Sequence, residues 1–275
     1  MRPPRRPWAL TAAATLITAV FLLPVYWMAK TSLTRPERIL VPSPQWVPTP
    51  VTTENYDTAL SYEGLARALL NSLVIAGGVV ALTLLLGLPL GYALARVRMR
   101  GSGTMVLALL VAQLPPAIVL AAPLFILERR AGLDDSYLGL IAADTTLTLP
   151  FTVIVLRPVL RAVPPELEEA ALVDGCGLTG VLLRIVLPIM VPGVIAAAGL
   201  SFLLAWGEFL FGLTLAGDSD VRPVTVVLNA FVGQHGTAWG ALMATATLIS
   251  LPVVCVFALF QRFIVGGLTA GSVRG

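Results

Sequence analysis

The ionisable side chains of this sequence are few, and their spacing does not suit catalysis. The one histidine, His235, lies in the polar stretch Gly233–Gly236, and no serine has a general base at a recognisable spacing. The paired histidines and glutamate of a membrane metalloprotease are absent. A glycine-rich loop ending in Lys-Ser or Lys-Thr is also absent, since the only lysine is Lys30. We therefore expect no catalytic residue, no metal site and no cofactor, and the chain cannot hydrolyse ATP by itself.

Acidic side chains gather instead in one polar stretch, Pro164–Pro192, which lies between two long apolar runs and is called the elbow below. Pro164 and Pro165 end the preceding segment and suit the first turn of a new helix, where a missing N–H has no consequence. The helix dipole favours negative charge in that turn. The first turn of the predicted helix contains three glutamates, which are Glu166, Glu168 and Glu169.

Small side chains predict a flat face on this helix. Leu167, Ala170, Ala171 and Asp174 recur at i, i+3, i+4 and i+7, so we expect them to share one side of the helix. The two alanines would let another backbone come close. This pattern predicts a helix-turn-helix that lies outside the lipid and offers a shallow apolar surface. The alternative is an ordinary polar loop.

Glycines and prolines are expected to set the turns and kinks in the rest of the elbow. Gly175 should end the helix, and Gly177 should allow a second turn before another helical run begins near Thr179. Pro188 and Pro192 should then break or kink the next segment as it enters an apolar stretch.

The elbow resembles the EAA loop of permease subunits in binding-protein-dependent ABC importers. The matching residues are Glu169, Ala170, Ala171, Asp174, Gly175, Gly177, Ile185, Leu187, Pro188 and Pro192. Cys176 stands where the family usually has alanine, and this small residue should pack similarly. The resemblance implies coupling helices that dock into a cleft on a cytoplasmic ATPase. It assigns ATPase coupling to Glu169, Ala170, Ala171, Asp174, Gly175, Gly177, Leu187 and Pro188, with Glu169 as the anchoring carboxylate.

Composition places the rest of the chain in a membrane. Charged residues make up 12% of the sequence and the mean hydropathy is +0.89, far outside the range of a soluble domain. The net charge of +3 comes without a basic face carrying interleaved aromatics, so we expect no nucleic-acid partner. Cys176 and Cys255 fall in an expected loop and an expected membrane helix, so a disulfide between them is not expected.

Apolar runs of about 20 residues predict an all-α, polytopic membrane protein with six transmembrane helices. The elbow is then a cytoplasmic coupling-helix loop between helices 4 and 5, and a short extracytoplasmic helix is expected near Thr58–Ala68. An uncleaved first helix is preferred over a signal peptide because its apolar run is long. The expected division is 1–66, 67–262 (with the elbow at 164–192) and 263–275. The expected spans are Trp8–Ala29, Leu69–Ala95, Thr104–Leu127, Leu138–Leu156, Pro192–Ala216 and Trp239–Phe263.

Polar or helix-breaking residues inside these spans are candidates for a solute path. Pro115 and Pro116 are tolerated at membrane depth where a cavity or neighbours satisfy the freed carbonyls. Glu208 is an ionisable group near membrane depth, with an interfacial or helix-capping carboxylate as the alternative. Asp144 invites the same two interpretations. Tyr92 could donate a hydrogen bond to a sugar or join two helices.

Counting Lys and Arg predicts the orientation, with both termini and the elbow in the cytoplasm. The cytoplasmic set of eleven is Arg2, Arg5, Arg6, Arg96, Arg98, Arg100, Arg157, Arg161, Arg184, Arg262 and Arg274. The opposite set of seven is Lys30, Arg35, Arg38, Arg67, Arg129, Arg130 and Arg222.

Further pieces are similar to the carbohydrate branch of the permease family, of the maltose type. They are Asn71-Ser72-Leu73, Gly91–Arg96, Pro123-Leu124, Gly132–Ser136, Trp206–Phe209, Gln261 and Gly266-Gly267-Leu268, and the family more often has asparagine at Gly207. This resemblance implies an inner-membrane permease that forms, with a second permease, the path for a sugar or sugar-like solute. Its other partners would be two cytoplasmic ATP-binding subunits and an extracytoplasmic solute-binding protein. The alternatives are a non-sugar solute (peptide, polyamine or phosphate) and a stand-alone channel or enzyme.

Overall fold

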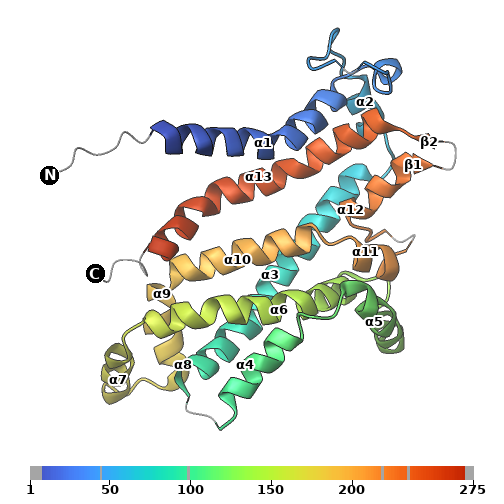
Figure 1. Cartoon of the computed structure of the whole chain (residues 1–275). Coiled ribbons are helices and arrows are strands. Elements are labelled where there is room, and N and C mark those ends of the chain that lie inside the picture. Colours follow the sequence, from blue (N-terminus) through green and yellow to red (C-terminus); the bar gives the residue numbers. More distant parts are fainter. Residues whose placement is uncertain (1–7, 44, 98–99, 218–219, 234–235, 270–275) are drawn as a thin grey trace. The chain divides into compact units, whose positions relative to one another are not determined.

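The computed structural model describes residues 8–43, 45–97, 100–217, 220–233 and 236–269, with residues 262–269 as backbone only. The regular secondary structure of the described chain is helical apart from one short hairpin (Figure 1). It divides into two compact units: Met1–Leu65 with Leu228–Leu251, and Ala66–Val227 with Pro252–Gly275. Helices α3 (Leu65–Arg96) and α13 (Trp239–Thr269) each run from one unit into the other. The division expected from the sequence, with boundaries after residues 66 and 262, is not tested by these two units and stays a prediction.

A buried amide organises the first unit. The side chain of Asn55 donates to the carbonyl oxygens of Ser32, at 3.0 Å, and Thr34, at 2.7 Å. Gly240 permits this arrangement, since a Cβ there would lie 2.0 Å from Asn55 Oδ1. The amide thus joins the chain after the first helix to the start of α13. The elements of this unit, besides the first part of α13, are α1 (Trp8–Ser32), η1 (Pro36–Arg38), α2 (Glu54–Leu60), η3 (Leu228–Phe231), β1 (Val232–Gly233) and β2 (Gly236–Thr237).

The antiparallel pair β1–β2 pairs Val232 with Thr237 and is the one departure from the all-α prediction in the described chain. The short helix expected near Thr58–Ala68 lies earlier, as α2, and α3 already begins at Leu65. Gly64 separates the two helices at φ +91°, a left-handed conformation that glycine adopts without strain.

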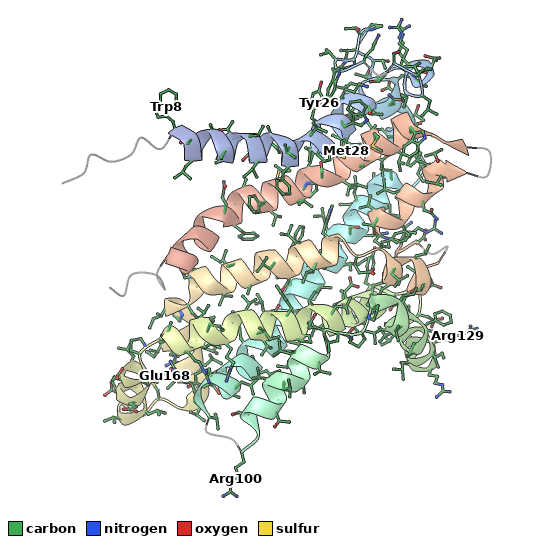
Figure 2. The ribbon with its side chains drawn as sticks, viewed as in Figure 1. Trp8, Tyr26, Met28, Arg100, Arg129 and Glu168 are labelled. Atoms are coloured by element: carbon green, nitrogen blue, oxygen red, sulfur yellow. The ribbon has the colours of Figure 1, made fainter. Side chains whose placement is uncertain are left out.

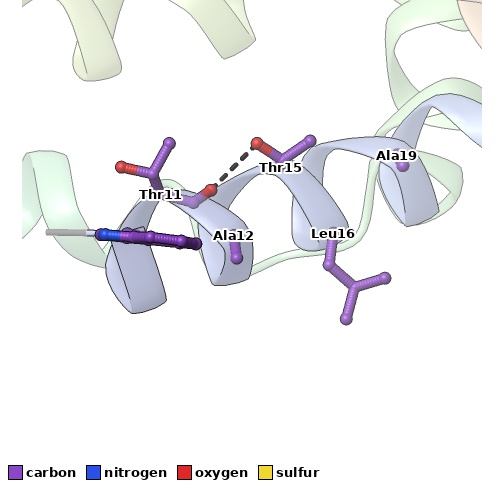
Figure 3. A pocket seen from close by; sticks show the side chains of 6 residues that line it. Thr11, Ala12, Thr15, Leu16 and Ala19 are labelled. Carbon is purple, nitrogen blue, oxygen red and sulfur yellow. Dashed lines mark hydrogen bonds between the residues drawn. The ribbon is translucent and has the colours of Figure 1, made fainter.

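Most of α1 is exposed and apolar. A shallow concavity of about 730 Å³ runs along Trp8–Ala19 and is lined by α1 alone (Figure 3). Its surface includes the small side chains Ala12, Thr15 and Ala19, and the Thr15 hydroxyl donates to the carbonyl of Thr11 at 2.9 Å. Because that hydroxyl is bonded within its own helix, the face can meet lipid or another helix without an unpaired polar group.

The second unit holds the remaining membrane helices and the elbow. Within it, α6 packs against α10 and α4 (Figure 1). Besides α3 and the end of α13, its elements are α4 (Ser102–Val111), α5 (Ala117–Ala131), α6 (Tyr137–Ala162), α7 (Pro165–Val173), α8 (Leu178–Gly180), the π-helical η2 (Val181–Val186), α9 (Leu187–Ile189), α10 (Val191–Trp206), α11 (Leu210–Leu215) and α12 (Val224–Val227).

Buried hydroxyl pairs join the three central helices of this unit. The hydroxyls of Thr83 in α3 and Thr148 in α6 lie 2.8 Å apart, and those of Thr152 in α6 and Ser201 in α10 lie 2.7 Å apart. Gly193 lets α10 approach α6 closely, since a Cβ there would lie 2.5 Å from Val159 Cγ1. Hydroxyl pairs and small residues are the usual means by which membrane helices associate. Thr148 therefore helps to join α6 to α3.

Length and composition identify four helices that could each cross a bilayer, together with one bent pair. The four are Trp8–Ser32, Leu65–Arg96, Tyr137–Ala162 and Trp239–Gln261, and the pair is Leu178–Ile189 with Val191–Trp206. The expected third span is not one helix, because Pro115 and Pro116 lie in a break between α4 and α5. The all-α membrane class is confirmed, whereas the count of six spans stays a prediction.

Asn71, which opens the second expected span, acts as a clamp at one end of this unit. Its buried amide donates to the carbonyl oxygens of Asp220, at 2.8 Å, and Arg222, at 2.9 Å. Its Oδ1 accepts from the Tyr137 hydroxyl at 2.7 Å. Next to it, Ser72 Oγ accepts from the N–H of Val224 at 2.8 Å. One side chain therefore ties α3, the start of α6 and the segment before α12 together.

Replacing Asn71 by leucine should destabilise the second unit. The change keeps the size of the side chain but leaves two backbone carbonyls and the Tyr137 hydroxyl without their partner, which costs about 1–3 kcal/mol. The midpoint of thermal unfolding in detergent should fall clearly, and Tyr137→Phe, which removes a single bond, should lower it less. Equal midpoints for Asn71→Leu and the unaltered protein would contradict the clamp.

Candidate functional site

The first elbow helix, α7, ends in the predicted way. Gly175 has φ +87°, and its N–H donates to the carbonyl of Leu172 at 3.0 Å. The N–H of Cys176 donates to the carbonyl of Ala171 at 2.9 Å. These two bonds form a Schellman motif, which needs a left-handed residue at the position of Gly175 and strongly favours glycine there. The turn is therefore closed by backbone bonds rather than left as a loose loop.

The second half of the elbow is a broken helix. It runs through α8, η2 and α9, and then bends by 84° into α10. Pro188 lies in α9, Pro192 lies in the first turn of α10, and the buried Met190 is at the bend between them. The predicted kink is confirmed. The π-helical turn of η2 was not predicted, since nothing in Val181–Val186 signals it.

A buried carboxylate fixes α7 to the membrane helices. Glu168 is 6% exposed, and its Oε1 accepts from Arg96 Nε at 2.6 Å. Its Oε2 accepts from the Tyr92 hydroxyl at 2.8 Å. Arg96 also donates to the carbonyl of Val163, just before α7. The group formed by Glu168, Arg96 and Tyr92 is called the clasp below, and it joins the last turns of α3 to the elbow.

Apolar packing supports the clasp. Ala171 is 7% exposed and belongs to a buried cluster with Val163, Val181 and Val186. Glu168 and Ala171 lie three residues apart, so they face the same way on α7. The inner face of α7 thus combines one bonded carboxylate with one small side chain against the second half of the elbow.

The outer face of α7 differs from the expected one. Leu167, Ala170 and Asp174 are exposed as expected, but Ala171 is not on their side. The i, i+3, i+4, i+7 pattern was too wide, because the two adjacent alanines are separated by about 100° around the helix and only one can face outward. Glu169 is exposed, so within this chain the anchoring carboxylate is Glu168 and not Glu169. The exposed large apolar residues of α7 and the start of α8 are Leu167, Leu172, Val173 and Leu178.

The possible solute-path residues are not brought together. Tyr92 belongs to the clasp. Pro115 and Pro116 lie between α4 and α5, where Gln113 Nε2 donates to the carbonyl of Leu147 at 3.0 Å. Glu208 caps the following helix, since its carboxylate accepts from the N–H groups of Phe211, at 2.8 Å, and Gly212, at 3.1 Å. For Glu208, helix capping was the alternative given by the sequence.

Asp144 lies beside the capping carboxylate. It is 3% exposed, and its Oδ1 has no hydrogen-bond partner among the described residues. A cavity of about 10 Å³ lined by Asp144, Glu208 and Ser72 has room for no more than about one water molecule. This space is too small for a saccharide, so the described second unit does not present a sugar pocket at this point.

Several expectations fall on residues outside the described ones. They concern His235 and the arginines Arg2, Arg5, Arg6, Arg98 and Arg274. Cys176 and Cys255 are both free thiols in the described chain. The pairing of Arg96 with Glu168 was not predicted from the sequence. The only signal was an arginine at the end of an apolar run and a glutamate three residues before a buried alanine.

The family described as the binding-protein-dependent transport system inner membrane component matches residues 87–269, which include the whole elbow and most of the clasped end of α3. The chain belongs to this family. It is therefore a permease component of a membrane transport system and not an enzyme.

Relatives match this permease along nearly its whole length. The diacetylchitobiose uptake system permease protein DasC of Streptomyces coelicolor is 34% identical over 271 residues, covering 98% of both chains. The trehalose transport system permease protein SugB of Mycobacterium tuberculosis is 34% identical and covers 95% of both chains. The trehalose/maltose transport system permease protein MalG of Thermococcus litoralis is 33% identical, covering 97% of this chain and 96% of the relative.

Solved structures share the fold at low sequence identity. A chain of a bacterial ABC transporter involved in the import of the acidic polysaccharide alginate has a TM-score of 0.77 at 17% identity, covering 95% of this permease and 99% of that chain. A chain of the MetNI methionine ABC transporter has a TM-score of 0.62 at 18% identity, covering 74% of this permease and 95% of that chain. The fold of the permease is thus that of an ABC-transporter membrane subunit.

Glu168 and Glu169 form a matched pair for testing the clasp. Glu168→Ala leaves a half-buried arginine and a half-buried tyrosine without their acceptor, so the elbow should open more often. Amide hydrogen exchange over residues 165–175 should accelerate about 10-fold to 100-fold, the range expected for a lost bond to a charged group. Glu169→Ala removes an exposed carboxylate and should leave the exchange unchanged. Equal exchange in both variants would show that the clasp does not hold the elbow.

Proposed function

We propose that this permease couples a separate ATPase to the import of a sugar or sugar-like solute, and that the clasped elbow is the coupling element. The observation that carries the proposal is the contrast between the two faces of α7. Its inner face is locked to α3 through Glu168, whereas Ala170 and Glu169 are exposed on the outside. A segment that only connects two membrane helices would not need an exposed face opposite the one that is bonded to α3.

The outer face of the elbow suits a docking protein. Val173, three residues after the small side chain of Ala170, is 87% exposed, and Leu178, at the start of the second half of the elbow, is 65% exposed. Exposed apolar side chains around a small residue favour a shallow contact with a partner. The resemblance to the EAA loop assigns that partner as a cytoplasmic ATP-binding subunit. Glu169, Ala170, Asp174, Gly175 and Gly177 would then form or shape the contact.

Transport requires that closure of the ATP-binding subunits moves the membrane helices between two states. In this permease the movement would enter at α7, pass through Glu168 to Arg96 and Tyr92, and so displace α3. The buried packing of Ala171 against Val181 would move the second half of the elbow with it. Leu187 and Pro188, at the end of that half, would pass the motion into α10 through the 84° bend.

The relatives favour a carbohydrate as the solute. The relatives above are permease proteins of diacetylchitobiose, trehalose and trehalose/maltose transport systems. Asn71 and Ser72, which form the clamp, also belong to one of the segments that resemble sugar permeases. We propose accordingly that a second permease subunit, two ATP-binding subunits and an extracytoplasmic solute-binding protein assemble with this chain. A solved alginate ABC transporter in complex with a periplasmic binding protein, whose chain matches at a TM-score of 0.66, gives a precedent for such an assembly.

The orientation follows from the same proposal. An ATPase partner requires that the elbow is cytoplasmic, which agrees with the excess of arginines on that side of the expected spans. Glu168 and Arg129 mark opposite ends of the second unit in Figure 2. Arg129 and Arg130 would therefore lie on the extracytoplasmic side, and both termini would be cytoplasmic.

Ala170→Trp tests the docking surface without disturbing the fold. Ala170 is exposed, so the larger side chain should be accommodated by this chain but should block a close partner. Co-purification of the ATP-binding subunit and ATP-dependent uptake should both fall by about tenfold or more. Ala131→Trp, at an exposed alanine at the end of α5, is the control and should keep co-purification. Gly175→Pro should also abolish uptake, because proline cannot adopt φ +87°. Normal co-purification and uptake with Ala170→Trp would refute the docking surface.

A deletion strain tests the class of solute. Growth on a panel of disaccharides and short oligosaccharides should fail for at least one saccharide, and should return when the gene is supplied on a plasmid. Growth on peptides, polyamines or phosphate at limiting concentration should be unaffected. A strain that grows on every saccharide but loses one of these other solutes would reassign the permease to a non-sugar importer.

A further inference from the structure

A second polar feature lies near the elbow but belongs to neither the clasp nor the docking surface. Between α4 and the last turns of α6 there is a pocket of about 250 Å³. Its lining includes Val106 and Leu109 of α4 with Ile154 and Pro158 of α6, and it includes two arginines, Arg157 and Arg161. All of these residues belong to the second unit. The mechanism described above uses none of them.

The two arginines are available to an anion. Arg157 and Arg161 are one helical turn apart, so their side chains project from the same side of α6. Ion pairs within the described chain join Arg67 with Asp220 and Arg96 with Glu168, so neither pocket arginine has a carboxylate within reach among the described residues. Arg157 Nε donates to the carbonyl of Leu94 at 3.3 Å, which leaves the terminal nitrogens of the guanidinium for other acceptors.

The polarity of the pocket changes along α6. Arg161 is next to the last residue of the helix, Arg157 is one turn further in, and Ile154 and the buried Val153 lie deeper. On the facing side, α4 begins at Ser102, and Val106 and Leu109 follow one and two turns later. The charged part therefore lies at the helix ends and the apolar part along the spans. An anionic phospholipid has the same order, with its phosphodiester at the membrane surface and its acyl chains below.

We propose that this pocket binds the headgroup of an anionic phospholipid. The guanidinium groups of Arg157 and Arg161 hold the phosphodiester, because an arginine offers a planar pair of donors that matches phosphate oxygens. The walls formed by Val106, Leu109 and Ile154 contact the glycerol and the upper part of an acyl chain. Basic pockets between membrane helices commonly bind anionic lipids. The bound lipid would fill the space between α4 and α6 directly before the elbow.

Native mass spectrometry of the importer purified with its partner subunits tests the site. The complex is exchanged into detergent containing equal amounts of phosphatidylglycerol and phosphatidylcholine. The unaltered complex should retain phosphatidylglycerol in preference to phosphatidylcholine. The double variant Arg157→Gln, Arg161→Gln should retain about 30-fold less phosphatidylglycerol, because the losses of affinity caused by the two substitutions multiply. Arg100→Gln is the matched control, since Arg100 is exposed beyond α3 and does not line the pocket (Figure 2).

Leu109→Trp separates the pocket from the charges. The larger side chain fills the apolar part and should lower lipid retention while both arginines remain. Equal retention of both lipids by the unaltered complex, equal loss in Arg100→Gln, or displacement of the lipid by millimolar inorganic phosphate would each overturn the proposal. Unchanged retention in the double variant would overturn it as well, because the lipid would then not be held by Arg157 and Arg161. Because none of these measurements involves uptake, the result is independent of whether the coupling proposal holds.

Discussion

A single buried carboxylate, that of Glu168, connects the part of this permease that a partner can touch with the part that crosses the membrane. Its two oxygens are divided between Arg96 and Tyr92, which lie one turn apart at the end of α3. A buried charge is tolerated only where it is paired and hydrogen-bonded, so loss of either partner destabilises the clasp. The clasp is therefore either formed or broken, without stable intermediate arrangements. A force on α7 cannot shift it gradually relative to α3 while the clasp is formed.

The rest of the second unit is suited to carry such a displacement. α3, α6 and α10 are joined by buried hydroxyl pairs, and Gly193 allows a close approach of α10 to Val159. Densely packed helices move as bodies and do not deform continuously. The helices of this unit are interrupted at defined places, namely the 84° bend near Met190 and the proline break between α4 and α5. The Asn71 clamp closes the far end of the same bundle, so that both ends of α3 are held by polar contacts.

The sequence predicted the elements of this permease better than their contacts. The Schellman turn at Gly175 and the kink at Pro188 and Pro192 could be predicted, because they depend on backbone conformations that few residues allow. The anchoring role went to Glu169 instead of Glu168, because the two are chemically identical and only the angle of α7 against α3 decides between them. The pattern that grouped Ala170 with Ala171 failed for the same reason. The break between α4 and α5 was read as prolines inside one span, since local sequence does not reveal whether neighbours satisfy the freed carbonyls.

The movement of the elbow with α3 is most directly measured as a distance between spin labels. The complete importer is prepared with Cys176 and Cys255 replaced by alanine, and with labels on cysteines introduced at the exposed positions Val173 and Val97. The distance distribution is recorded by pulsed electron paramagnetic resonance without nucleotide and with ATP trapped before hydrolysis. If the clasp transmits motion, the distance between the two labels stays the same in both states while uptake remains active. A change of several ångströms between the states would mean that α7 moves relative to α3, and the coupling account would be wrong.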